Sequence, residues 1–186
     1  MTPFAALVPL PPAGAGFYRS LGLAPFLGGR IVLAERPDPP GAVLVWPGEP
    51  GVFYDFEGNL HRRAPAPADA GPLAGDPRPL GVLYGVRDLV DSIAWYQETL
   101  GLTLVHYDPE SDWAELRGGE GLAVLLTFAA DENRRGVLVL EVADAAAFVR
   151  AHPRPVWTRG TGWGRLAAYA DPAGNPLLFI DRSGSG

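Results

Sequence analysis

The chain has 186 residues, of which 47% are hydrophobic, and its formal net charge is −6. This length can bury the core of one large domain or two small ones, and the acidic balance argues against a nucleic-acid-binding or anionic-membrane surface. The chain has no Cys, and all fifteen basic residues are Arg, which excludes disulfides, cysteine nucleophiles, Schiff-base lysines and a P-loop lysine.

Residues 1–16 contain no basic residue, and prolines interrupt their short apolar run, so they predict an early strand and loop and no secretion signal. No apolar run in the chain approaches the length that spans a bilayer. The composition is rich in Ala, Gly, Pro and Arg without Lys, as GC-rich codon usage produces. We therefore expect a bacterial, cytoplasmic protein.

Residues 1–63 are predicted to form a degenerate N-terminal βαβββ-like module, because three of their segments echo later segments in the same order. FYRSLGL (17–23) echoes WYQETLGL (95–102), GAVLVW (41–46) echoes LAVLLTF (122–128), and YDFEGN (54–59) echoes YADPAGN (169–175). Echoes in a fixed order indicate module duplication. Chance similarity among common turn residues is the alternative.

The Pro-, Ala- and Gly-rich stretch 64–79 predicts a linker, since it cannot supply a core strand or a long helix. Beyond it, residues 80–182 show the order βαβββ twice. The expected strands are 80–86, 102–108, 112–118, 122–128, 136–142, 165–171 and 176–181, and the expected helices are 88–101 and 144–153. The tail, 183–186, is expected to be disordered.

The first of these helices has its apolar residues at helical spacing. Asp91 or Ser92 is the expected N-cap, and Gly101 is expected to follow the last turn. The second helix is expected to stop at Pro153. The segment VWTRGTGWGR (156–165), before the final hairpin, is expected to be a mobile loop because it contains three glycines.

Together these motifs resemble a known superfamily. V-x-D-x-x-x-S-x-x-W-Y at 86–96, L-G-L at 100–102 and Y-A-D-P-A-G-N at 169–175 are similar to the vicinal oxygen chelate superfamily. That superfamily includes glyoxalase I, extradiol dioxygenases, fosfomycin-resistance transferases and bleomycin-binding resistance proteins. The resemblance spans residues 80–182 and implies an α+β fold, in which paired βαβββ modules form a curled mixed sheet around a concave cavity.

The resemblance also implies where a metal ion would be bound. Members that use a metal place a ligand on the first strand of each module and another after the D-P-x-G-N turn. Those positions hold Gly81, Val137 and Leu178, which offer no side-chain donor to an ion. We therefore expect no metal and no other cofactor.

The three histidines do not replace these ligands, because their spacing fits no metal-binding pair. His106 lies in a predicted strand, where it is either a pocket residue or an ordinary strand residue. His61 and His152 lie beside a turn and a helix end, so both are expected to be exposed.

A cavity without an ion can still bind a ligand through aromatic walls and a few placed polar groups. The candidate ligand-binding residues are Trp113, Glu115, Phe128 and Tyr169 on strands, Glu141 on the first strand of the second module, and Trp163 and Arg165 in the segment 156–165. Glu141 needs a partner, for which an arginine or a ligand amine is expected. The alternative for Trp113 and Phe128 is that they fill the core.

Three functions remain open at this point. The first, which we favour, is a metal-free small-molecule binding protein, similar to the bleomycin-resistance branch, that sequesters a drug or metabolite. The second is a lyase or dioxygenase with displaced ligands, for which Glu115, Glu141 and His106 are the candidates. The third is a degenerate module kept for assembly.

The expected partner is a small molecule, and no nucleic acid or membrane is expected. We expect the N-terminal piece to pack on the rest of the chain or on a second chain in a homodimer, since members of the superfamily often dimerise.

Overall fold

The computed structural model describes residues 2–9, 15–21, 30–34, 41–66, 76–129, 135–161 and 164–182, and these residues form two β-sheets and three helices. Most of the expected linker, the expected disordered tail and Trp163 lie outside the described residues. None of the described helices is long and apolar enough to cross a membrane.

An eight-stranded mixed sheet contains two consecutive βαβββ modules, and its strand order is β11-β12-β13-β10-β6-β9-β8-β7. The first module consists of β6 (Arg78–Val86), α3 (Leu89–Leu100), β7 (Thr103–Asp108), β8 (Trp113–Arg117) and β9 (Ala123–Phe128). The second consists of β10 (Val137–Glu141), α4 (Ala145–Ala151), β11 (Trp157–Thr161), β12 (Gly164–Ala170) and β13 (Pro176–Asp181). The predicted repetition of βαβββ is therefore confirmed.

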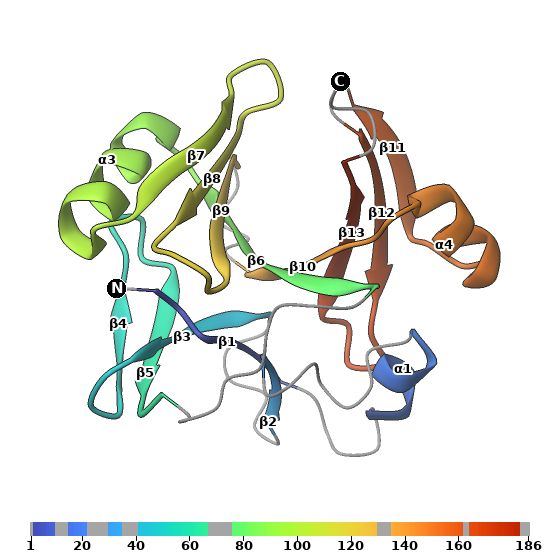
Figure 1. The fold of residues 1–186 in the computed structure, drawn as a ribbon, viewed down its shortest axis with the longest axis horizontal. Coiled ribbons are helices and arrows are strands. Elements are labelled where there is room, and N and C mark those ends of the chain that lie inside the picture. The colour runs from blue at the N-terminus through green and yellow to red at the C-terminus, as the bar shows by residue number, and fades with distance from the viewer. Residues whose placement is uncertain are drawn as a thin grey trace.

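The eight-stranded sheet is curled. In Figure 1 its two ends rise as walls on either side of β6 and β10, with α3 and α4 on the outer sides of the walls. In each module the first strand pairs in parallel with the last, and the antiparallel pair of β6 with β10 joins the two modules. The α+β fold expected from the sequence is confirmed.

The helix ends follow from local sequence, with one difference from expectation. Asp88, rather than Asp91 or Ser92, is the N-cap of α3, and its carboxylate accepts the backbone N–H of Asp91 at 2.9 Å. Asp88 takes this role because it still has extended backbone geometry, whereas Asp91 and Ser92 already lie inside the helix. Gly101 follows the last turn with a φ of 66°, as predicted.

The segment 156–165 also differs from expectation, because Trp157–Thr161 form the edge strand β11, which pairs antiparallel with β12. Glycines weaken the strand signal in the sequence. The hydrogen bonds that order this segment come from β12, and pairing of that kind cannot be read from the segment itself.

A second, five-stranded sheet is formed by the N-terminal piece, in the order β2-β1-β3-β5-β4. The elements of the N-terminal piece are β1 (Ala5–Pro9), α1 (Ala15–Ser20), β2 (Ile31–Ala34), β3 (Val43–Pro47), β4 (Gly51–Tyr54) and β5 (Leu60–Ala64). Figure 1 shows this sheet beneath β6 and β10, on the side away from the two walls.

The pairing in the N-terminal sheet repeats that at the centre of the larger sheet. The parallel pair β1–β2 matches β6–β9, the antiparallel pair β1–β3 matches β6–β10, and the parallel pair β3–β5 matches β10–β13. The N-terminal piece thus has the connectivity of two abbreviated modules, where the sequence echoes suggested one. In this arrangement β3 is the counterpart of β10 and not, as the echo suggested, of β9.

The two D-x-x-G-N turns have the same structure. Asp55 and Asp171 each accept three hydrogen bonds inside their own turn, including the backbone N–H and the side-chain amide of Asn59 or Asn175. Gly58 and Gly174 both have a φ of 82°, a conformation that favours glycine. This shared geometry explains why the two turns share residues in the sequence.

Each of these aspartates also accepts a tyrosine hydroxyl from the other half of the chain. Tyr96 in α3 donates to Asp55 at 2.6 Å, and Tyr18 in α1 donates to Asp171 at 3.0 Å. Both tyrosines are fully buried, and residues of both sheets form one continuous hydrophobic core. The N-terminal sheet therefore packs on the rest of its own chain through a pair of reciprocal contacts.

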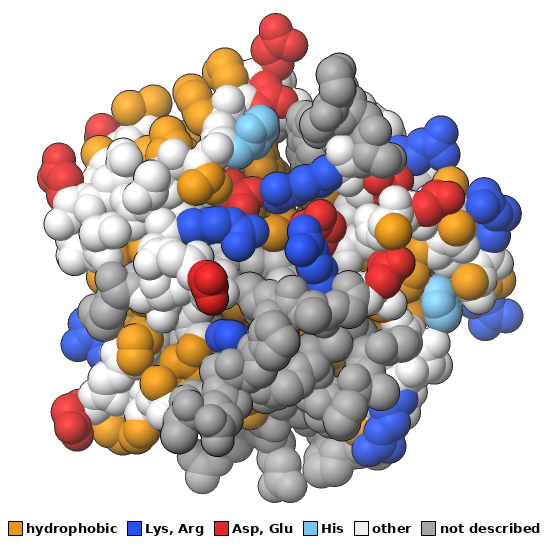
Figure 2. All heavy atoms as spheres, in the orientation of Figure 1, with side chains coloured by type: hydrophobic (Ala, Val, Ile, Leu, Met, Phe, Trp, Pro, Cys, Tyr) orange, Lys and Arg blue, Asp and Glu red, His pale blue; other side chains and the backbone are white. Residues whose placement is uncertain are grey.

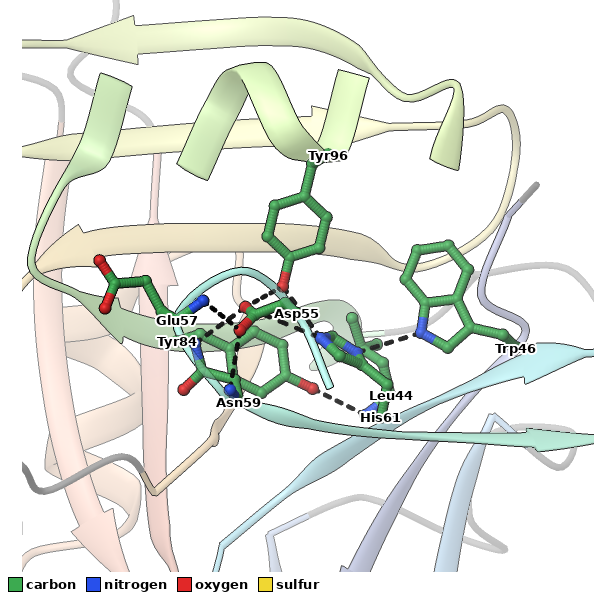
Figure 3. A network of polar contacts seen from close by, with 8 residues as sticks. All are labelled: Leu44, Trp46, Asp55, Glu57, Asn59, His61, Tyr84 and Tyr96. Atoms are coloured by element: carbon green, nitrogen blue, oxygen red, sulfur yellow. Dashed lines mark hydrogen bonds and ion pairs between the residues drawn. The ribbon is translucent and has the colours of Figure 1, made fainter. Parts of the chain in front are cut away.

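A buried chain of donors extends from Asp55 (Figure 3). The indole N–H of Trp46 donates to Nδ1 of His61 at 3.1 Å. Because indole can only donate, Nδ1 is the acceptor, so the proton of the neutral imidazole lies on Nε2. His61 Nε2 then donates to the Tyr96 oxygen at 2.9 Å, and Tyr96 donates to Asp55.

The expectation that His61 is exposed is wrong, because its side chain is 0% exposed and lies among aromatic rings. Burial lowers the pKa of His61 and outweighs the nearby Asp55 carboxylate, which acts in the opposite direction. Burial would raise the pKa of Asp55, but the proximity of His61 and the hydrogen bonds from Tyr96 and Asn59 outweigh it, so this pKa is lowered. The pair is therefore a neutral imidazole beside a charged carboxylate.

We predict that Tyr96→Phe destabilises the protein more than Tyr18→Phe does. Both changes remove a buried hydroxyl that donates to an aspartate, but only Tyr96→Phe also leaves the Nε2–H of His61 without an acceptor. From the usual penalty for an unpaired buried polar group, we expect losses in the free energy of unfolding of about 3 kcal/mol and about 1 kcal/mol respectively. Urea unfolding measures both, and equal losses would contradict the donor chain through His61.

We also predict that the free energy of unfolding falls as the pH is lowered from 7 to 5. The unfolded chain protonates His61 near its ordinary value of 6.5, whereas the folded protein holds that pKa lower. Below pH 6.5 the unfolded state therefore binds more protons, and stability decreases. The aspartate and glutamate contributions lie lower, because the ordinary pKa values of Asp55 and Glu115 are 3.8 and 4.5.

Urea unfolding at several pH values checks this prediction. His61→Gln should remove the dependence on pH in this range, whereas His106→Gln, at an exposed histidine, should keep the slope of the parent. A parent protein whose stability is flat between pH 7 and 5 would refute the neutral, buried state of His61.

Candidate ligand-binding cavity

The concave face of the eight-stranded sheet has an aliphatic floor. The residues that form it pack in a cluster separate from the main core, and they include Leu80, Ala123, Leu125, Val139, Leu178 and Ile180. The register between β6 and β10 shifts between Val139 and Leu140, and beyond this shift Arg78 lies opposite Glu141. The irregularity brings a charged pair to one end of an otherwise apolar face.

A cavity of about 480 Å³ opens at this end of the concave face. Its lining combines Val105, His106 and Trp113 with the charged residues Arg78, Glu115, Arg117 and Arg182. In Figure 2 basic and acidic side chains gather in the hollow between the two walls. Its volume falls in the range of small-molecule sites.

Glu115 is a buried charge in the lining of this cavity, with 2% of its surface exposed. Its two carboxylate oxygens accept hydrogen bonds from different arginines, Nε of Arg117 at 2.6 Å and Nη2 of Arg182. Burial would raise the pKa of Glu115, but the charge of Arg182 and the hydrogen bond and charge of Arg117 outweigh it and hold the pKa below its ordinary value. Glu115 is therefore ionised at neutral pH and fixes two guanidinium groups at the cavity.

Glu141 has the arginine partner that the sequence analysis expected. Nη2 of Arg78 donates to Glu141 Oε1 at 2.8 Å, across the β6–β10 pair. About half of the Arg78 side chain is exposed, so this pair is at the rim, and its net contribution to stability is small. It nevertheless places a third guanidinium beside the cavity.

The expected metal positions are on the apolar floor or in strand contacts. A Cβ at Gly81 would lie 2.1 Å from the carbonyl oxygen of Ala123 on β9, so the strands leave no room for a side chain there. Val137 and Leu178 pack in the aliphatic cluster. The alternative donors Glu115 and Glu141 are already paired with arginines, and no group of His, Asp and Glu in the described parts of the chain could hold a metal ion.

The structure brings only some of the predicted binding residues together. Trp113 and Glu115 line the cavity, and Glu141 is paired with its rim residue Arg78. Phe128 is half exposed at the end of β9 and does not line it. For Trp163 the described residues provide no test.

Arg165 and Tyr169 lie on the opposite face of β12. Their neighbours Leu166 and Ala168 pack on the concave floor, so alternation along the strand turns Arg165 and Tyr169 towards α4. Tyr169 packs against Phe148 and Phe179, and its hydroxyl donates to the backbone carbonyl of His152. Tyr169 was expected in this strand, whereas Arg165 was expected to act from the loop that ends at it, and the sequence offered no means of choosing the face of the strand.

The arginines of the cavity were missed by the sequence analysis. Arg117 could have been found, because it lies two residues after Glu115 and so shares its face of β8. Arg78 and Arg182 had no such signal. Arg78 precedes a register shift that alternation does not reveal, and Arg182 follows the last strand.

The strand pairing decides the fold class. Two βαβββ modules, joined through their first strands into one curled sheet, occupy residues 78–181. The chain has the vicinal oxygen chelate fold.

No protein-family model and no curated protein matches the chain. Among solved structures, methylmalonyl-CoA epimerase from Mycobacterium tuberculosis is similar, with 23% identity and a TM-score of 0.46 over 60% of this chain and 91% of that one. A glyoxalase/bleomycin resistance protein/dioxygenase superfamily member from Vibrio splendidus 12B01 has 14% identity and a TM-score of 0.43 over 56% and 98% of the two chains.

A methylmalonyl-CoA epimerase from Streptomyces coelicolor is also similar, with 16% identity and a TM-score of 0.43 over 59% of this chain and 96% of that one. Identities and TM-scores of this size carry no conclusion about activity. The assignment of the fold rests on the strand order and pairing.

We predict that the purified protein holds no stoichiometric divalent metal. The strand contact at Gly81 and the apolar residues at Val137 and Leu178 leave no set of converging donors. Elemental analysis should find no equivalent of Zn, Fe, Ni or Mn, and a chelator should leave the thermal midpoint unchanged. One metal ion per chain, or a marked loss of stability on chelation, would contradict this prediction.

Proposed function

We propose that this protein binds a small organic anion with an aromatic or other apolar part in the concave cavity, without a metal ion. The observation that carries the proposal is the buried Glu115, which holds the guanidinium groups of Arg117 and Arg182 at the cavity. A carboxylate buried only to brace two cations is costly to maintain. Binding of a ligand to those two guanidinium groups would give the buried carboxylate a function.

The arginines retain donors for a ligand. A guanidinium group has five N–H donors, and Glu115 uses one described hydrogen bond from each of its two partners. The lining and its rim pair carry three positive charges, on Arg78, Arg117 and Arg182, against the two negative charges of Glu115 and Glu141. The local excess is therefore positive, although the chain as a whole is acidic.

The apolar part of the ligand has a matching wall. Trp113 and Val105 line the same cavity as the arginines, and the aliphatic floor continues from Trp113 along the concave face. Burial of an aromatic ring against Trp adds about 1 kcal/mol beyond the area term. The lining therefore suits a ligand whose charged head binds the arginines and whose apolar body lies along this wall.

A metal-dependent lyase or dioxygenase is less well supported by the same residues. That alternative needs Glu115 and Glu141 as ligands, and each is engaged by arginine in the described structure. Releasing them would leave three arginines without their carboxylate partners beside the metal ion. We therefore propose sequestration of a drug or metabolite anion as the function.

Ligand binding can be tested by tryptophan fluorescence with a library of planar carboxylates, sulfonates and phosphates. For ligands of the concave cavity, Arg182→Gln should weaken binding by about tenfold or more, because it removes a charge-assisted hydrogen-bonding group. Arg165→Gln, which removes an arginine from the opposite face of the sheet, should leave their binding unchanged. A library without any ligand, or ligands that all bind Arg182→Gln as tightly as the parent, would overturn the proposal.

A further inference from the structure

A second hollow lies on the opposite, convex face of the sheet, between α4 and the strands β11 and β12. Its volume is about 540 Å³, which also falls within the range of small-molecule sites. The helix contributes Ala146, Val149 and Arg150 to the lining, and the strands contribute Gly160, Arg165 and Ala167. The hollow shares Arg165 with the predicted binding residues but is separate from the concave cavity.

Small residues leave this hollow open. A Cβ built at Gly160 would meet no atom within 4 Å, so the edge strand has open space beside it where it faces α4. Ala146 and Ala167, on the helix and the neighbouring strand, also have short side chains. The apolar space between helix and sheet is therefore not filled by these residues, as it would be in a close-packed contact.

Two arginines flank this apolar space, one on the helix and one on the strands. Arg150 lies in the last turn of α4, and Arg165 lies in β12. Neither side chain has a hydrogen bond or an ion pair with any residue that the structure describes. No acidic residue belongs to the described lining.

Arg159 of β11 also belongs to the lining of the hollow. Its cross-strand partner Leu166 packs against the concave cluster, so strand alternation places the Arg159 side chain on the face of β11 opposite to Gly160. Arg165 pairs instead with Gly160, across the open space. Arg165 and Gly160 therefore share the face of the sheet that looks onto α4.

We propose that this hollow binds an apolar carboxylate. The hydrocarbon part would lie between α4 and the strands, and Arg150 and Arg165 would bind the carboxylate from opposite walls. Guanidinium groups match the planar geometry of a carboxylate and form strong charge-assisted hydrogen bonds with it. The hydrocarbon part gains free energy in proportion to the apolar surface that it buries. This site does not depend on the function proposed for the concave cavity.

Calorimetric titration of the full chain with octanoate tests the site, with octanamide as the uncharged counterpart. Octanoate should bind. Octanamide should bind more weakly, by about tenfold or more, because it cannot form the charge-assisted contacts. Arg150→Gln and Arg165→Gln should each weaken octanoate binding by about tenfold. Arg87→Gln removes the same charge from an exposed arginine just after β6, in the other module, and should change the affinity by less than about twofold.

Gly160→Val tests the hollow itself. A β-branched residue suits an edge strand, and the open space beside Gly160 accepts the new side chain without a clash. The variant should fold with the thermal midpoint of the parent and lose octanoate binding, whereas Arg182→Gln in the concave cavity should retain it.

Three results would overturn this proposal. The first is the absence of octanoate binding to the parent. The second is an equal loss of affinity in Arg87→Gln, which would indicate a general charge effect. The third is a loss in Arg182→Gln but not in Gly160→Val, which would place octanoate in the concave cavity and support the proposed function instead.

Discussion

Burial of one face of the curled sheet is the constraint on which the remaining structure depends. The N-terminal sheet, α3 and α4 cover the convex face, and the buried aspartates Asp55 and Asp171 fix how the halves meet. A buried carboxylate is tolerated only where donors surround it. Each D-x-x-G-N turn supplies three such donors and a tyrosine from the other half supplies the fourth, so the contact is specific as well as apolar.

The two faces of the sheet differ in how their charged side chains are held. On the concave side, Glu115 is stable in its buried position because Arg117 and Arg182 neutralise it, and in doing so it orients both guanidinium groups. The positive charge in this cavity is thus carried by arginine side chains of the protein itself. On the convex side, the short residues of α4 and β11 leave an opening that Arg150 and Arg165 flank. In both places an arginine is combined with an apolar wall, but only on the concave side is it held by a described carboxylate.

Much of the C-terminal fold could be predicted because its signals are local. Apolar strands separated by turn residues, the helical spacing of α3, Gly101 after its last turn and the two D-x-x-G-N turns all depend on neighbouring residues. The errors have a common origin in long-range contacts. β11 becomes a strand through β12, and His61 becomes buried because Trp46 and Tyr96, from other elements, enclose it.

The sequence by itself determined the repeated βαβββ order, the equivalence of the two aspartate turns and the lack of side-chain donors at Gly81, Val137 and Leu178. These follow from residue type and spacing, which need no partner strand. Only the tertiary structure decided that the N-terminal piece pairs like two abbreviated modules, that Arg182 meets Glu115, and that Arg165 faces α4 rather than the concave cavity. The physical reason is that the face, register and partner of a strand are set by hydrogen bonds and packing between segments distant in sequence.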